Sequence, residues 1–369
     1  GLSAMLVLVA LCLAMRGLAL HGHAEKITRS HPSNGSRSCV YPGTCDPPMA
    51  KFSRVIRGPR AGQQWNINGG FCGSFSLQQS ALAHGAWISQ DLVRKANKDS
   101  PGPHHMHGDS TLGYEVMPIN VAFTAKALKL TYDEWDYTSP KPQASAYLQW
   151  VKQHLTKGNP IVFFPICKGD PHRCYPGSCP NGGQVDHVEP IFGIFSNYSL
   201  DDPKVYPDDV LLHASDQDYA PYYRKMNSLP DSLEMEGNCK NAQPGFGKNE
   251  MYPCFDETVT YGLAVTGMEM AANFTLPVSL VVDTDEEPNV RMFAPPSKIF
   301  GNVSVDLESV SPGTPCNLYR YNSTETFPSS PEIVVSFNAT HNQWVYADPI
   351  AFLSNSATYY KAACDSSPR

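Results

Sequence analysis

The sequence contains no block of lysine or arginine, and its 369 residues carry a formal net charge of −7. A surface that binds nucleic acid needs clustered positive charge, so this composition argues against nucleic acid as a partner. Beyond the N-terminal residues there is no long uninterrupted apolar run, and we therefore predict no membrane-spanning helix.

The central cysteines Cys167, Cys174 and Cys179 lack the Cys-x-x-Cys spacing that is typical of structural zinc sites. The run His104-His105-x-His107, followed by Asp109, contains metal-binding residue types. It lies in a loop rich in proline and glycine, where such side chains are usually solvated. We predict neither a metal nor another cofactor.

The N-terminus indicates a secretory route. Residues 4–15 form a short apolar run that resembles a signal peptide and is too short to span a bilayer comfortably. Six Asn-x-Ser/Thr sequons follow in the chain, and we expect N-glycans at Asn34, Asn197, Asn273, Asn302, Asn322 and Asn338. Together with the many cysteines, these features predict a secreted or lysosomal/vacuolar glycoprotein.

The cysteine count leaves two alternatives. Of the 11 cysteines, Cys12 lies in the predicted leader, and all the others can pair, with Cys72 among them. Alternatively, Cys72 and Cys167 are thiols, and the remaining cysteines pair with their neighbours. One such set of pairs is Cys39–Cys45, Cys174–Cys179, Cys239–Cys254 and Cys316–Cys364, and the sequence leaves the connectivity open.

The pattern of apolar residues predicts an α+β protein in four parts: a leader (1–24), a linker or pro-like arm (25–50), a mixed domain (51–270) and an all-β domain (271–369). In the mixed domain, helical periodicity runs from Cys72 through Lys98, and further helices are expected over 115–130 and 144–156. Strands follow at 161–166, 188–195, 210–214 and 260–266.

After residue 270 the helical period disappears. Short strands separated by turn residues are expected at 278–282, 303–307, 317–321, 333–337 and 343–347. This spacing is typical of a β-sandwich, in which two antiparallel sheets share one core.

The stretch Gly69-Gly70-Phe71-Cys72-Gly73-Ser74 suits thiol chemistry. It places Cys72 at the beginning of a helix, where unbonded N–H groups and the helix dipole favour the thiolate. The glycine pair lets the backbone approach a substrate closely. Upstream, the amide of Gln64 is a candidate donor to an oxyanion, with Gln63 as the alternative.

A cysteine nucleophile needs a base and a group that orients the base. His187 opens the apolar strand after the glycines at 182–183 and is the best candidate base. The next strand runs into Asp216, which could fix the imidazole tautomer. His213 and Asp218 compete for that role, because a long insert, 197–209, separates the two strands.

These motifs resemble the papain-like cysteine peptidase superfamily. Cys72-Gly73-Ser74 at a helix start, the strand that begins at His187, and the strand that ends in Ser215-Asp216 follow its Cys–His–Asp/Asn order. The last strand is most similar to the double-glycine-leader peptidases. Phe75 and Ser76 stand where cathepsins carry Cys and Trp. The resemblance covers roughly residues 60–265 and implies a helical part, an antiparallel sheet and a catalytic Cys–His–Asp triad.

The function expected from these residues is hydrolysis of peptide or protein substrates through a thioester on Cys72. His187 would act as the base, Asp216 would orient it, and Gln64 would bind the oxyanion. Two alternatives stay open. One is a catalytically inactive scaffold that binds or adheres through its β-domain, and the other is transfer of the acyl group to an amine. The sequence does not indicate the preferred substrate side chains.

Overall fold

The computed structural model describes residues 46–99, 115–136, 142–168, 184–214, 221–228, 261–269, 276–284, 299–352 and 356–365, with gaps at 61, 63, 66–69, 117, 119, 165 and 187. All of them belong to one compact unit, Cys39–Arg369, and none to the other unit, Gly1–Ser38. The predicted leader and most of the predicted linker therefore lie outside the described residues.

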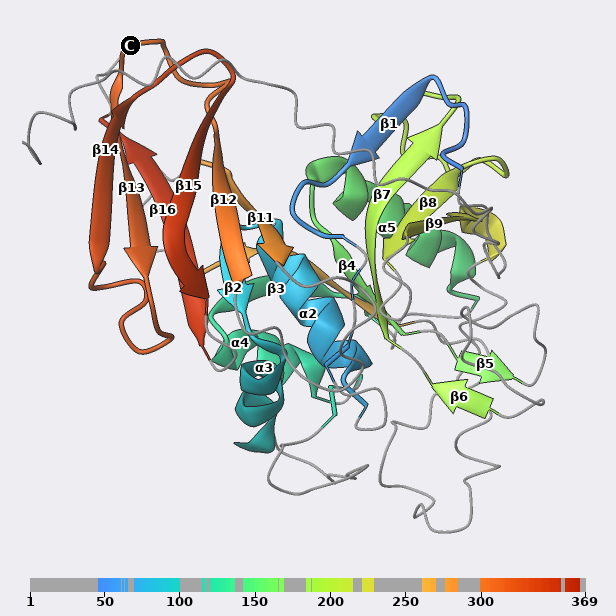
Figure 1. Cartoon of the computed structure of the whole chain (residues 1–369). Helices are drawn as coiled ribbons and strands as arrows, with labels where there is room; N and C mark the ends of the chain where they lie inside the picture. Colours follow the sequence, from blue (N-terminus) through green and yellow to red (C-terminus); the bar gives the residue numbers. More distant parts are fainter. Residues whose placement is uncertain are drawn as a thin grey trace, which may run out of the picture. The chain divides into compact units, whose positions relative to one another are not determined.

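The described residues mix helices with antiparallel sheets, as the α+β prediction requires (Figure 1). The α-helices are α2 (Cys72–Leu82), α3 (Gln90–Ala96), α4 (Val121–Ala127) and α5 (Ala144–Lys157), with short 3-10 turns η2 (Asn97–Asp99) and η5 (Met226–Ser228). Helix α5 agrees with its predicted range. Helix α4 is shorter than predicted, because the chain enters a strand at Leu130.

The largest sheet has seven strands in the order β3-β10-β4-β7-β8-β9, and β1 pairs with β7. Its strands are β1 (Phe52–Val55), β3 (Leu130–Glu134), β4 (Ile161–Phe163), β7 (Glu189–Ser196), β8 (Val210–Ala214), β9 (Pro221–Lys225) and β10 (Gly262–Met268). The strand predicted at 161–166 is divided, because Ile166 belongs to β5 (Ile166–Lys168), which pairs separately with β6 (Gln184–Asp186).

The C-terminal strands form two further antiparallel sheets. One contains β11 (Val278–Thr284), β12 (Ile299–Asp306) and β15 (Gln343–Phe352); the other is ordered β14 (Ile333–Asn338), β13 (Pro315–Tyr321), β16 (Ala357–Cys364) and β2 (Ala86–Ile88). Both contribute to one hydrophobic cluster, for example through Leu280 and Leu318. The disulfide Cys316–Cys364 joins β13 to β16, which confirms that predicted pair.

The helix predicted from Cys72 through Lys98 is interrupted: the structure divides it into α2 and α3, with β2 between them. Helix α2 ends at Leu82, and Ile88 lies in β2, which pairs with β16. Gly85 explains the break, because its φ of +80° is left-handed. A Cβ there would lie 2.7 Å from a methyl carbon of Val278. The sheet ordered β14-β13-β16-β2 thus combines residues 86–88 with strands from beyond residue 270.

Helix α2 is buried on all sides from Gly73 to Leu82, although a helical periodicity of apolar residues predicts only one buried face. It packs against β4 and β7 of the large sheet, and also against β2 and β11, which belong to the two smaller sheets that contain the C-terminal strands (Figure 1). Its polar side chains are therefore bonded internally. Gln78, for example, donates from Nε2 to the carbonyl oxygen of Ile88 at 3.0 Å.

His84, in the turn after α2, predicts a pH dependence of stability. Its Nε2 lies 2.9 Å from the carbonyl oxygen of Val265, and burial lowers its pKa from 6.5 to about 4, although that hydrogen bond opposes the shift. Because the folded-state pKa is below the unfolded one, the unfolded chain binds the proton first as pH falls. We expect the free energy of unfolding to decrease by about 1–2 kcal/mol between pH 7 and 5, nearer the lower value because His84 is only partly buried.

The matched variant is His84→Gln, which keeps an N–H donor but does not titrate. Chemical denaturation at both pH values should show a smaller decrease for this variant than for the parent. Equal decreases in the two proteins would contradict the assignment. Histidines elsewhere whose pKa burial also lowers, such as His213, are common to both proteins and cancel in the comparison.

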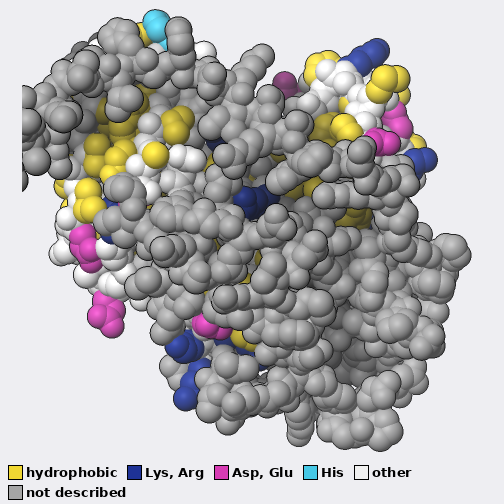
Figure 2. Space-filling model, in the orientation of Figure 1, with side chains coloured by type: hydrophobic (Ala, Val, Ile, Leu, Met, Phe, Trp, Pro, Cys, Tyr) yellow, Lys and Arg dark blue, Asp and Glu magenta, His cyan; other side chains and the backbone are white. Residues whose placement is uncertain are grey.

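The surface of the described residues offers scattered apolar side chains. Figure 2 shows hydrophobic side chains over the C-terminal strands and over β1. The large exposed ones are Met49, Phe52, Val55, Tyr198, Val334 and Val345. Phe52 and Val55 both lie in β1, whereas Tyr198, Val334 and Val345 come from other parts of the chain; scattered apolar side chains of this kind are ordinary for a protein surface. Within the described ranges, no helix has the length and apolar character needed to cross a membrane.

Candidate functional site

Cys72 is the first residue of α2, as the sequence predicted. The residue before it, Phe71, makes no side-chain capping bond, and the first turn holds no acidic residue. A thiolate at this position would face N–H groups and the positive end of the helix dipole. Cys72 is half-buried and is not part of a disulfide. These properties suit a nucleophilic thiol.

Close packing explains the glycine that follows the cysteine. A Cβ at Gly73 would lie 2.5 Å from the carbonyl oxygen of Val116, so the loop before α4 lies directly on the first turn of α2. One turn later, the hydroxyl of Ser76 donates to the carbonyl oxygen of Cys72 at 2.9 Å. The start of α2 is therefore held from outside and from within the helix.

Gly70 forms the turn that leads into α2. Its φ is +65°, and a Cβ there would lie 1.8 Å from Oε1 of Glu115, so only glycine fits. The Gly70 carbonyl oxygen accepts a hydrogen bond of 2.9 Å from Nη1 of Arg94. Sequence reasoning did not identify Arg94 or Glu115, because neither belongs to a local motif.

Gln64 is buried, with 6% of its surface exposed, and its Oε1 has no hydrogen-bond partner among the described residues. The chain before it runs along α2. Arg60 N–H donates to Oε1 of Gln79, and a Cβ at Gly62 would lie 2.9 Å from the Phe75 ring. Arg60 thus lies beside Gln79 near the C-terminal end of α2, and Gly62 lies beside Phe75 near its N-terminal end. The segment that leads to Gln64 therefore runs towards the N-terminal end of α2.

His187 and Asp216 lie outside the described residues, as does the alternative Asp218. The strands beside them are described. β7 begins at Glu189 and β8 ends at Ala214, and the antiparallel pair Ile191↔His213 brings these two ends to the same edge of the sheet. Val188, next to His187 in the chain, is buried in the hydrophobic cluster against which Cys72 packs.

His213, the other alternative for orienting the base, is engaged inside the sheet. Its Nδ1 lies 2.7 Å from Oε1 of Glu189, which also accepts a 2.5 Å hydrogen bond from the hydroxyl of Tyr222. His213 is completely buried, and burial lowers its pKa, although Glu189 opposes the shift. This network ties β7, β8 and β9 together at the same edge.

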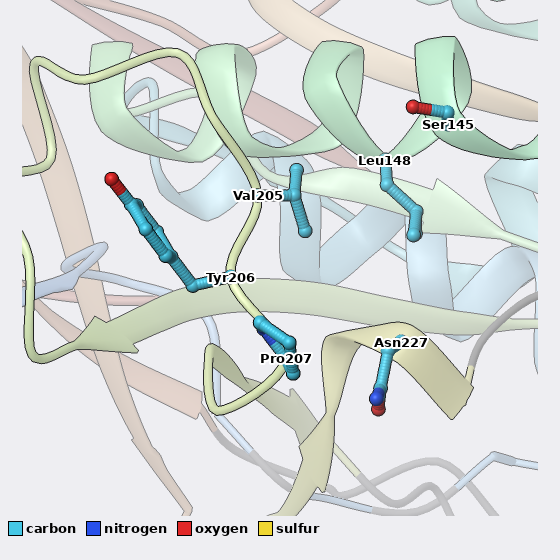
Figure 3. A pocket seen from close by; sticks show the side chains of 6 residues that line it. All are labelled: Ser145, Leu148, Val205, Tyr206, Pro207 and Asn227. Carbon is cyan, nitrogen blue, oxygen red and sulfur yellow. The ribbon is translucent and has the colours of Figure 1, made fainter.

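The pocket in Figure 3 involves none of the predicted site residues. Leu148 of α5 and Val205 point into a cavity of about 320 Å³, which is completed by Ser145, Tyr206, Pro207 and Asn227. We assign it no role. No group of three or more potential metal ligands occurs in the parts of the chain that the structure describes. The residues from His104 to Asp109 are not among them.

Comparison with known proteins does not place the chain in a family. No family model matches the sequence, and no curated protein matches it.

Proposed function

We propose that this chain is a thiol-dependent peptidase in which Cys72 is the nucleophile and His187 the general base. The observation that carries the proposal is the position of Cys72 as the first residue of α2, in contact with the cluster that contains Val188. The Cys72 thiol and Val188, the residue that follows His187 in the chain, therefore pack in the same hydrophobic region.

In this proposal, His187 accepts the Cys72 proton, and the thiolate sulfur attacks the substrate carbonyl carbon. The resulting oxyanion accepts hydrogen bonds from the Cys72 N–H and the Gln64 amide. The C–N bond breaks as His187 returns the proton to the departing amine. Water, deprotonated by His187, then hydrolyses the thioester and restores the thiol. Asp216 accepts the other imidazole N–H and fixes the ring orientation.

The finer fold assignment belongs to the same proposal. Residues 51–270 would form a papain-like domain, and the two C-terminal sheets a β-sandwich around their common cluster. We also propose that the chain passes through the secretory route. Among the six sequons, Asn197, Asn302 and Asn338 have exposed side chains in the structure and would be accessible to glycosylation.

The triad is tested by variants at its orienting position. Asp216→Asn should retain more activity than Asp216→Ala, because an amide oxygen still accepts the imidazole N–H, whereas alanine lets the ring rotate. We expect the alanine variant to lose about 10²- to 10⁴-fold in kcat/KM. The measurement is hydrolysis of a fluorogenic peptide mixture between pH 4 and 9, and we expect a bell-shaped pH profile.

Asp218→Ala is the matched control and should retain most of the activity. If it loses activity while Asp216→Ala matches the parent, Asp216 is not the orienting residue. Absence of any hydrolysis, together with a slowly alkylated Cys72, would favour the binding scaffold instead. Formation of amide products when an amine is added would identify acyl transfer.

A further inference from the structure

Behind the Cys72 turn lies a buried arginine whose position the proposed mechanism does not explain. Arg94, on α3, has a relative exposure of 0%. Its Nη1 donates to the carbonyl oxygen of Gly70 at 2.9 Å, and its Cζ lies 4.8 Å from the centroid of the Phe71 ring. Arg94 therefore contacts the two residues that immediately precede Cys72.

A buried guanidinium is costly unless opposite charge or hydrogen bonds compensate for the lost hydration. Burial lowers the pKa of Arg94, and interactions with Glu115, Cys72 and Asp91 oppose this shift. Interaction between two charges is reciprocal, so a group that favours charged Arg94 is itself favoured as an anion by Arg94. Cys72 is one of these groups.

Glu115 is the acidic counterpart at the same turn. Its carboxylate lies against Gly70, and its carbonyl oxygen accepts hydrogen bonds from Nδ2 of Asn97 at 2.6 Å and from Nδ2 of Asn120 at 2.9 Å. These bonds hold the backbone of Glu115 in place. Its negative charge opposes that of a Cys72 thiolate and attracts Arg94.

We propose that Arg94 is a positioning residue of the Cys72 site, which holds the Gly70–Phe71 turn through its hydrogen bond and stabilises the Cys72 thiolate with its buried positive charge. Glu115 limits this stabilisation. The inference rests on the proposed reactivity of Cys72. The ionisation itself is simple: the S–H bond of Cys72 breaks, the sulfur keeps the electron pair, and the proton passes to solvent or to His187.

Other charges near this turn are weaker candidates. Asp91 and Lys95 both lie on α3. Burial raises the pKa of Asp91, and the positive charges of Lys95 and Arg94 oppose this shift. Lys95 is exposed, so its charge is well screened by solvent. His187, the proposed base, also acts on the thiol, and every variant below retains it. Arginine stays charged at all pH values considered.

The experiment measures the rate of Cys72 alkylation by iodoacetamide, a neutral reagent, from pH 4 to 10. It uses the full chain, with the modified residue identified by peptide mass. Arg94→Gln removes the charge, Arg94→Lys keeps it, and Glu115→Gln removes the opposing charge. Lys95→Gln is the matched control, because it removes a positive charge from the same helix without touching Gly70.

We expect Arg94→Gln to raise the apparent pKa of the Cys72 thiol by about 1, which is a tenfold smaller thiolate fraction at low pH. Arg94→Lys should keep the thiol pKa close to that of the parent, because it retains the positive charge. Glu115→Gln should lower the thiol pKa, and Lys95→Gln should leave it unchanged. Opposite shifts support an electrostatic role, because general loosening of the turn would move both the Arg94→Gln and Glu115→Gln values in one direction.

Shifts in the same direction for these two variants, or no shift in either, would overturn the inference. If Arg94→Gln does not fold, a Glu115→Gln value at or above that of the parent overturns it, and a lower value supports it. Peptide hydrolysis with a thiol pKa insensitive to Arg94 and Glu115 would refute the inference while the proposed function stands. The predicted pKa shifts without any peptide hydrolysis would support the inference about Arg94 and refute the proposed peptidase function.

Discussion

Replacing Cys72 by alanine is expected to reduce peptide hydrolysis by about 10⁴-fold or more, because the proposed reaction has no other nucleophile. The fold should survive. Alanine is favourable at a helix start, and Cys72 is only half-buried, so little apolar contact is lost. The measurements are kcat/KM on a fluorogenic peptide and the thermal unfolding midpoint, which should change by no more than a few degrees.

Ser76→Ala is a suitable control for this experiment. It lies one turn further along α2 and removes the hydroxyl that donates to the Cys72 carbonyl oxygen, but it leaves the thiol in place. Most of the activity should remain in this variant. If Cys72→Ala unfolds where the parent is stable, or keeps parental activity, the nucleophile assignment fails.

Ending the chain after residue 269 is expected to prevent cooperative folding. The removed strands include β16, which pairs with β2, and they supply most of the cluster that covers Phe71, Leu82 and Trp87. Burying a large apolar side chain contributes about 1.5–3 kcal/mol. The loss at these three residues alone is comparable to the entire stability of a typical domain, about 5–15 kcal/mol.

The measurement is denaturant unfolding followed by tryptophan fluorescence, since Trp65 and Trp87 belong to this cluster. A chain that ends after Asp365 is the control, because it retains the bond from Asp365 N–H to the carbonyl oxygen of Pro315. It should match the parent. A chain of residues 1–269 that unfolds cooperatively and alkylates Cys72 like the parent would show that the C-terminal strands are an independent module.

The local sequence determined several parts of this structure. The start of α2 at Cys72, the extent of α5, and the strands around Val188 and Val210 follow from apolar periodicity, glycine placement and β-branched composition. The Cys316–Cys364 pair was also predicted, as part of one possible set of neighbour pairs. These features depend on residues close together in the chain, or on the chemistry of one residue type.

Only the tertiary structure decided the rest. Residues 86–88 continue a helical pattern, yet they form β2, because β16 offers hydrogen-bond partners from the other end of the chain. Helix α2 is buried all round because sheets from both halves pack against it. Arg94 and Glu115 meet at Gly70 because α3 and the loop before α4 pack onto the start of α2. Local propensity is weak compared with the burial and pairing that distant segments provide, so no local pattern could reveal these contacts.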